Sequence, residues 1–269
     1  MKSIQLGTIK LAYQDQGTGP VVVLLHGYPL DSRMWEPQIE ALSKSCRVIA
    51  PDLRGFGQSS QSSEDATNGV SMSQYAADVA ELLAAISVTE PVILCGFSMG
   101  GYILWQFLRQ FPERVKAIVP CDTRAIADSA EARQGRLKTA GEVMKSGVEP
   151  IITAMLPKLL SEATRHSRLD IVAALTAIMN GCSPAAIAAS LRGMADRPDV
   201  TADLPKITQP ALVLVGAEDV ISSPDEMRGI AEKLPDAEFV EIPAAGHMTT
   251  LENPAAVNAA LLDFIKRQS

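Results

Sequence analysis

Ser98 is the residue best placed for chemistry, because it stands between two glycines in the segment Gly-Phe-Ser-Met-Gly at positions 96–100. The apolar run 91–95 precedes this segment, and a largely apolar stretch, 99–111, follows it and stops before a proline. A buried strand, a tight turn and a helix form the context that presents a serine as a nucleophile. Glycines allow the crowded turn, and the helix start behind the serine favours a developing oxyanion. We therefore predict that Ser98 attacks an acyl carbonyl.

A serine nucleophile needs a general base and a carboxylate that orients the base. His247 is the candidate base because it follows the last strand-like run, whereas His166 lies in a polar stretch and is expected at the surface. Asp219 follows the preceding strand-like run and is favoured as the acid over its neighbour Glu218. Asp122, just past another apolar run, is the second candidate acid. The order along the chain is then nucleophile, acid and histidine.

The oxyanion formed by this attack requires two backbone N–H donors. The amide of Met99, directly after the nucleophile, is the first candidate. The second should come from the loop after the strand-like run 21–25, where Tyr28 is favoured because Pro29 has no N–H. His26, in the same loop, is predicted to hold the backbone rather than to act in catalysis.

Three further residues are candidates for substrate binding. Arg124 follows a predicted strand end and could pair with a substrate carboxylate, the alternative being a structural ion pair. Leu30 and Trp35 flank the predicted oxyanion loop. Several methionines of the middle segment could line an adaptable apolar acyl pocket, or could be ordinary helix core; they are Met144, Met155, Met179 and Met194.

The predicted elements that position these residues alternate between strands and helices, which is typical of a mainly parallel sheet wrapped by helices. A hairpin is expected over 4–16, followed by strands at 21–25, 47–50, 92–95, 115–120, 211–215 and 238–242. Helices are expected at 35–43, 71–87, 99–111 and 254–267, and in the middle at 129–145, 148–160, 167–179 and 184–195. We interpret 1–121 with 201–269 as the core and 122–200 as a helical cap within one folding unit, over the strand ends where open α/β sheets bind ligands.

Composition limits the function classes that the chain can serve. The 269 residues carry a formal net charge of −7, which argues against general binding to nucleic acids or anionic membranes. No apolar stretch reaches membrane-span length and the first residues lack a signal-peptide core, so a cytoplasmic location is expected. The four cysteines are predicted to be buried free thiols, and the three scattered histidines argue against a metal site.

The chain resembles the α/β-hydrolase superfamily over nearly its whole length. The resemblance is carried by segments 26–29, 51–59, 96–100, 216–219 and 246–247. Within the superfamily it is similar to the serine-nucleophile esterase, lactonase and haloperoxidase-like group, and segments 30–35 and 121–125 most resemble 3-oxoadipate enol-lactonases. The resemblance implies an eight-stranded, mostly parallel sheet whose second strand is antiparallel, with a helical cap inserted after the sixth strand.

The candidate residues and the resemblance together predict a serine hydrolase that cleaves small carboxylic esters of short to medium acyl chains through an acyl-enzyme, without metal or cofactor. An enol-lactonase that acts on a dicarboxylate-derived lactone is the main alternative. A carbon–carbon bond hydrolase, a perhydrolase and a non-enzymatic receptor for a small ester or lactone are further alternatives. Ser98 argues against haloalkane dehalogenases and epoxide hydrolases, which need a carboxylate nucleophile at this position.

Overall fold

A computed structural model describes residues 1–268 and contains one eight-stranded sheet in the order β1-β2-β4-β3-β5-β6-β7-β8. β2 pairs antiparallel with both β1 and β4, and every other neighbouring pair is parallel. The predicted eight-stranded, mostly parallel sheet is thereby confirmed. The strands are β1 (Lys2–Leu6), β2 (Ile9–Gln16), β3 (Val21–Leu25), β4 (Arg47–Pro51), β5 (Val92–Phe97), β6 (Val115–Cys121), β7 (Ala211–Gly216) and β8 (Ala237–Ile242).

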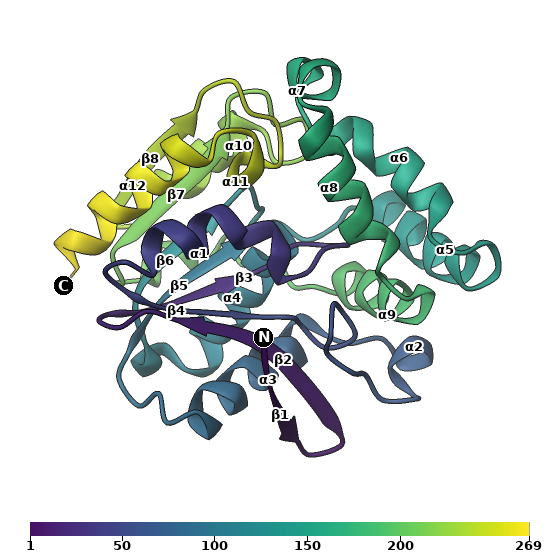
Figure 1. Cartoon of the computed structure of the whole chain (residues 1–269), viewed down its shortest axis with the longest axis horizontal. Helices are drawn as coiled ribbons and strands as arrows, with labels where there is room; N and C mark the ends of the chain where they lie inside the picture. The colour runs from purple at the N-terminus through teal and green to yellow at the C-terminus, as the bar shows by residue number, and fades with distance from the viewer. Residues whose placement is uncertain (269) are drawn as a thin grey trace.

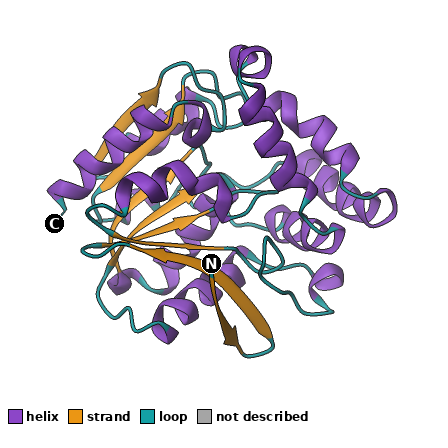
Figure 2. Ribbon diagram, viewed as in Figure 1, coloured by secondary structure: helices purple, strands orange, loops and turns teal. Residues whose placement is uncertain are grey.

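Helices cover both faces of this sheet, which explains why its central strands are apolar without alternation. Every residue of β3, β5 and β7 is buried, whereas the edge strands β1 and β8 are partly exposed. One face packs against α3 (Met72–Ala85), α4 (Met99–Gln110) and α10 (Pro224–Ala231). The other packs against α1 (Glu36–Leu42) and α12 (Pro254–Arg267), and Figure 2 shows the resulting three layers.

Five helices inserted between β6 and β7 form the cap. They are α5 (Ala130–Ser146), α6 (Glu149–Leu159), α7 (Glu162–Ser167), α8 (Leu169–Asn180) and α9 (Pro184–Ala195), and in Figure 1 they form a group beyond one end of the sheet. The sequence predicted four helices here. The fifth, α7, begins because the Ser161 hydroxyl accepts a hydrogen bond from the Thr164 amide and caps a new helix.

Backbone hydrogen bonds join the cap to the rest of the chain at separate places. The Met248 amide, next to His247, donates to the Leu159 carbonyl over 2.9 Å. The Val70 amide donates to the Ala189 carbonyl in α9 over 3.1 Å. The cap is therefore fixed both beside the predicted base and beside the segment that follows β4.

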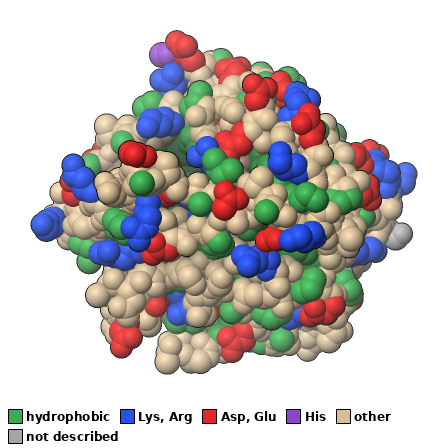
Figure 3. Space-filling model, turned by 180° about the vertical axis from the view of Figure 1, so that it is seen from behind, with side chains coloured by type: hydrophobic (Ala, Val, Ile, Leu, Met, Phe, Trp, Pro, Cys, Tyr) green, Lys and Arg blue, Asp and Glu red, His purple; other side chains and the backbone are tan. Residues whose placement is uncertain are grey.

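Short elements complete the described part of the chain. They are η1 (Ser32–Trp35), α2 (Asp65–Asn68), η2 (Pro112–Arg114), η3 (Leu204–Lys206) and α11 (Thr249–Glu252). All four cysteines are buried free thiols, as predicted. On the face seen in Figure 3, acidic and basic side chains are interspersed rather than gathered by sign. Within residues 1–268 no single helix has the length and hydropathy of a membrane span; α8 and α9 meet both criteria only together, across a bend of 92°.

Candidate active site

Ser98 lies in a strained turn between β5 and α4. Its backbone has φ 51° and ψ −114°, a conformation that non-glycine residues rarely adopt. The Ser98 amide donates to the Cys121 carbonyl over 2.9 Å, and the Thr123 hydroxyl donates to the Ser98 carbonyl over 2.7 Å. A Cβ on Gly100 would overlap the Leu25 carbonyl oxygen, so the start of α4 needs glycine to pack against the end of β3. Contacts from β3 and β6 therefore hold the strained turn.

A continuous chain of hydrogen bonds connects Ser98, His247 and Asp219. The Ser98 Oγ lies 3.0 Å from His247 Nε2, and His247 Nδ1 lies 2.7 Å from Asp219 Oδ2. Because a carboxylate only accepts, Nδ1–H donates to Asp219, and in the neutral imidazole Nε2 then accepts from the Ser98 hydroxyl. His247 and Asp219 are buried, whereas Ser98 remains partly exposed. The serine is thus accessible, and its hydrogen-bond partners are shielded from water.

The Asp219 carboxylate is held by its own loop as well as by His247. Its Oδ1 accepts hydrogen bonds from the amides of Ile221, over 2.7 Å, and Ser222, over 3.0 Å. These two donors hold the carboxylate in a fixed position beside the imidazole. The neighbouring Glu218 side chain is exposed and does not contact His247 within the described hydrogen bonds.

The environment of His247 has opposing effects on its basicity. Burial lowers the pKa of the imidazole, but the charge and hydrogen bond of Asp219 raise it, and Asp122 and Glu252 add to that increase. The net result is a pKa above 6.5, the ordinary value for histidine. His247 is accordingly a stronger base than a free histidine.

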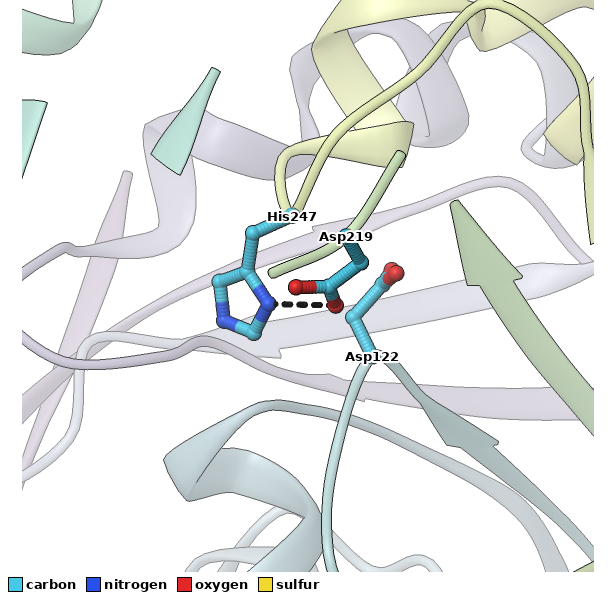
Figure 4. Close-up of side chains that lie close together, drawn as sticks. All are labelled: Asp122, Asp219 and His247. Atoms are coloured by element: carbon cyan, nitrogen blue, oxygen red, sulfur yellow. Dashed lines mark hydrogen bonds and ion pairs between the residues drawn. The ribbon is translucent and has the colours of Figure 1, made fainter. Parts of the chain in front are cut away.

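Asp122, the second candidate acid, lies beside this chain without joining it. In Figure 4 Asp219 stands between the imidazole and Asp122, and the dashed bond joins His247 to Asp219. Asp122 instead accepts hydrogen bonds from the Gly216 amide and from the Thr249 hydroxyl. Burial, together with the negative charge of Asp219, raises the pKa of Asp122 to about 8.

Asp122, Asp219 and His247 also form the described cluster with metal-ligand chemistry, because one donor atom from each lies within 4.8 Å of the others. Donor atoms of these residues are already hydrogen-bonded within the protein: Nδ1 of His247 to Asp219, and both oxygens of Asp122 to Gly216 and Thr249. Because these atoms already take part in hydrogen bonds, the cluster is better suited to proton transfer than to metal coordination.

The loop after β3 lies directly against the serine. A Cβ on Gly27 would fall 3.2 Å from the Ser98 Cβ, so the loop backbone passes close to the nucleophile. Among the hydrogen bonds of residues 1–268, neither the Tyr28 nor the Met99 amide has an acceptor. The His26 side chain fixes this loop with two hydrogen bonds. Its Nδ1 donates to the Gly27 carbonyl over 2.9 Å, and its Nε2 accepts from the Leu53 amide over 2.9 Å. Two free donors therefore remain beside Ser98.

Of the residues predicted to contact substrate, Arg124, Leu30 and Trp35 lie outside the lining of the pocket between the cap and the site. Arg124 Nε donates to both carboxylate oxygens of Glu226, over 2.7 and 3.0 Å, which is the structural ion pair. Leu30 and Trp35 are fully buried in the core, where Trp35 meets the ring of Phe97 edge-on. Among the methionines, Met179 and Met194 are buried, Met144 is exposed and Met155 lines the pocket.

That pocket, of about 660 Å³, lies between the cap and the loops of the site. Tyr28, from the oxyanion loop, and Ile221, from the loop that holds Asp219, form part of its wall, although Ser98 itself does not. The cap supplies most of the remaining lining, which is Arg136, Thr139, Glu142, Val143, Ser146, Gly147, Pro150, Ile151, Ala154, Met155, Lys158 and Leu191. The size is that of a site for a small molecule.

Sequence reasoning missed Glu252, which connects the cap to the histidine loop. This buried carboxylate accepts a hydrogen bond from the Gly246 amide and another from the Ser161 amide of the cap, each over 2.9 Å. Gly246 immediately precedes His247, so the bridge fixes the backbone beside the base. The one sequence signal for Glu252 is its position five residues after His247. Its role could not be predicted because one of its partner amides, that of Ser161, lies 91 residues away in the sequence.

Comparison with protein families places this site in a known context. Residues 22–260 match the model of a family described as the alpha/beta hydrolase family. A protein of Mycobacterium tuberculosis with the provisional name non-heme bromoperoxidase BpoC is 35% identical over 263 residues, with 95% of this chain and 97% of that protein covered.

Two solved structures of similar proteins are named after different acyl substrates. An esterase from Thermogutta terrifontis, solved with malate bound, superposes with a TM-score of 0.96 and 37% identity, covering 100% of this chain and 99% of the other. The enol-lactonase from Burkholderia xenovorans LB400 superposes with a TM-score of 0.89 and 25% identity, covering 98% and 100%. The predicted resemblance to the esterase, lactonase and haloperoxidase-like group is confirmed.

Proposed function

Because the chain belongs to the alpha/beta hydrolase family, we propose that it hydrolyses small carboxylic esters through an acyl-enzyme formed on Ser98. The observation that carries the proposal is the hydrogen-bond chain from Ser98 through His247 to Asp219. The two free amides beside the serine support it, because an acyl transfer needs donors where the negative charge develops.

In this mechanism the Ser98 hydroxyl gives its proton to His247 Nε2 while Oγ forms a bond to the ester carbonyl carbon. The amides of Tyr28 and Met99 hold the resulting oxyanion, each worth about 3 kcal/mol of barrier. When the carbon–oxygen bond to the alcohol breaks, His247 returns the proton to the departing oxygen. Water then loses a proton to His247, attacks the acyl-enzyme and releases the acid, and Ser98 recovers its proton. Asp219 stabilises the imidazolium at each stage.

A lactonase is the second candidate, favoured by the similarity to the Burkholderia enol-lactonase. A lactone is a cyclic ester, so the same three side chains open it without a change in chemistry. The difference is that the alcohol stays attached to the acid after the ring opens. Pocket shape and charge, rather than the nucleophile, would then decide between the two substrates.

The first experiment measures steady-state hydrolysis of p-nitrophenyl acetate, butyrate and octanoate by the wild type and by Ser98→Ala. We expect wild-type turnover to peak at one chain length, which reports the pocket size. The variant should lose at least about 1,000-fold in kcat, because an alanine cannot form the acyl-enzyme. A folded variant that keeps wild-type turnover would refute the proposal.

The lactone alternative is tested by titrating the acid released from a series of simple lactones under the same conditions. A kcat/KM for a lactone that exceeds the best ester value by tenfold or more would assign the protein to the second candidate. Lactone values below those of the esters would assign it to the first.

A further inference from the structure

Two arginines of the cap region share one carboxylate. Asp128 Oδ2 accepts from Arg136 Nε and Asp128 Oδ1 accepts from Arg197 Nη1, each over 2.6 Å. A single carboxylate neutralises one of the two guanidinium charges. Arg197 is buried and lies over the Tyr102 ring, 4.3 Å from its centroid, so it is committed to the interior. Arg136 is partly exposed and lines the pocket, so the surplus positive charge faces that space.

A second cation lines the same pocket from the neighbouring helix. Lys158 of α6 is exposed and has no ion-pair partner within residues 1–268. Glu142, the acidic residue among those that line the pocket, has its Oε1 3.7 Å from Nζ of Lys138, one turn earlier on α5. Its negative charge is therefore balanced by a lysine on its own helix. The pocket is thus locally positive in a protein whose formal net charge is −7. Such a local reversal of charge attracts an anionic group.

Tyr28 brings this positive region close to the reacting groups. Tyr28 lines the pocket, and no hydrogen bond of its hydroxyl is found within residues 1–268. Burial raises the pKa of Tyr28 far above the working range, with the nearby Arg136 charge opposing only part of the increase, so the hydroxyl stays a donor. The backbone amide of the same residue is one of the two free donors beside Ser98. Tyr28 therefore connects the pocket that Arg136 lines to the oxyanion loop.

We propose that this pocket selects esters that carry a second, free carboxylate, with Arg136 as the main specificity-determining residue and Lys158 as a secondary one. The inference rests on the proposed ester hydrolysis and adds the class of substrate. Val143, Ile151 and Met155 form an apolar wall for the methylene chain between the two ends of the substrate. The guanidinium still has N–H groups beyond those bonded to Asp128 and Met194, and these can bind a carboxylate.

The test compares monoethyl adipate with ethyl hexanoate, in which a methyl group replaces the free carboxylate. Initial rates are followed by acid release at constant pH, and the measured quantity is the ratio of the two kcat/KM values. We expect the wild type to prefer the anionic ester and Arg136→Gln to lower the ratio at least tenfold. Lys158→Gln should lower it about threefold, and Arg136→Lys should restore part of it because it keeps the charge.

Arg133→Gln is the matched control, because Arg133 lies on the same helix but pairs with Asp196 outside the pocket. It should leave both kcat/KM values unchanged. Competitive inhibition of ethyl hexanoate hydrolysis by adipate gives a second readout that needs no turnover of the anion, and Arg136→Gln should raise the inhibition constant about tenfold. Melting temperatures of the variants check that each one folds.

The outcomes separate this inference from the function on which it rests. Hydrolysis of ethyl hexanoate with a ratio that changes less than twofold in both Arg136→Gln and Lys158→Gln would overturn the carboxylate preference alone. No hydrolysis of either ester by folded wild-type protein would overturn the proposed function, and with it the inference.

Discussion

The bond between His247 and Asp219 determines how activity should depend on pH. Protonated His247 cannot accept the Ser98 proton, so kcat/KM falls as the pH drops through the pKa of the histidine. Since Asp219 contributes to raising that pKa above 6.5, the acid limb of the wild-type profile should have its midpoint above 6.5. Asp219→Asn should move the midpoint to lower pH and reduce kcat by about 1,000- to 10,000-fold. Ester hydrolysis measured between pH 5 and 9 tests both effects.

Asp122→Asn is the control for this prediction, because Asp122 is also buried but does not bond to His247. Asparagine keeps an oxygen acceptor for the Gly216 amide, while its amide nitrogen can donate to the Thr249 hydroxyl, which in the wild type donates to Asp122. We expect a loss in kcat below about tenfold, since no contact to the imidazole is removed. A larger loss in Asp122→Asn than in Asp219→Asn would instead assign the orienting role to Asp122.

At the scale of elements, the contact between β3 and α4 depends on the absence of a side chain at Gly100. Gly100→Ala would drive a methyl group into the Leu25 carbonyl, so we expect a loss of more than about 2 kcal/mol in the free energy of unfolding. The displaced strand end would also move the oxyanion loop and lower kcat. Gly135→Ala is the matched control in another helix, where a Cβ meets nothing within 4 Å. It should stabilise by about 0.5–1 kcal/mol, because alanine favours helix more than glycine does.

Urea unfolding of the two glycine variants measures these free energies. Equal changes in Gly100→Ala and Gly135→Ala would mean that the start of α4 tolerates a side chain and that packing against β3 does not hold the turn at Ser98 in place. A stability loss confined to Gly100→Ala would support the packing argument.

Elements with a clear local signal could be predicted from the sequence. The apolar run before Ser98 and the helix after it are visible in the residues themselves, and so is the order Ser98, Asp219, His247. Features that depend on distant segments could not be predicted. α10 was missed although Ser223 and Pro224 are typical helix-start residues, because its apolar face is short. The ion pair between Arg124 and Glu226 joins residues 102 positions apart. The sequence around Arg124 therefore cannot distinguish an arginine that is free to bind a substrate from one held in a structural ion pair.

At the scale of the whole molecule, the cap and the sheet should unfold together. The cap is hydrogen-bonded to the rest of the chain through Leu159, Ser161 and Ala189, and its buried residues belong to the same apolar clusters as the sheet. We expect one transition that coincides when it is followed by far-ultraviolet circular dichroism and by tryptophan fluorescence. Both tryptophans, Trp35 and Trp105, are buried outside the cap, so the fluorescence reports the sheet region. Two separated transitions would show that the cap is an independent unit.

The buried Glu252 carboxylate has a consequence for anyone who exchanges cap segments to redesign this protein. Its two oxygens satisfy one amide from each side of the junction, Gly246 and Ser161. A transplanted cap without a backbone N–H at the position of Ser161 would leave one oxygen of this buried carboxylate without a hydrogen-bond donor, beside the loop that carries His247. Grafts should therefore keep the segment around Ser161 and vary only the helices that line the pocket.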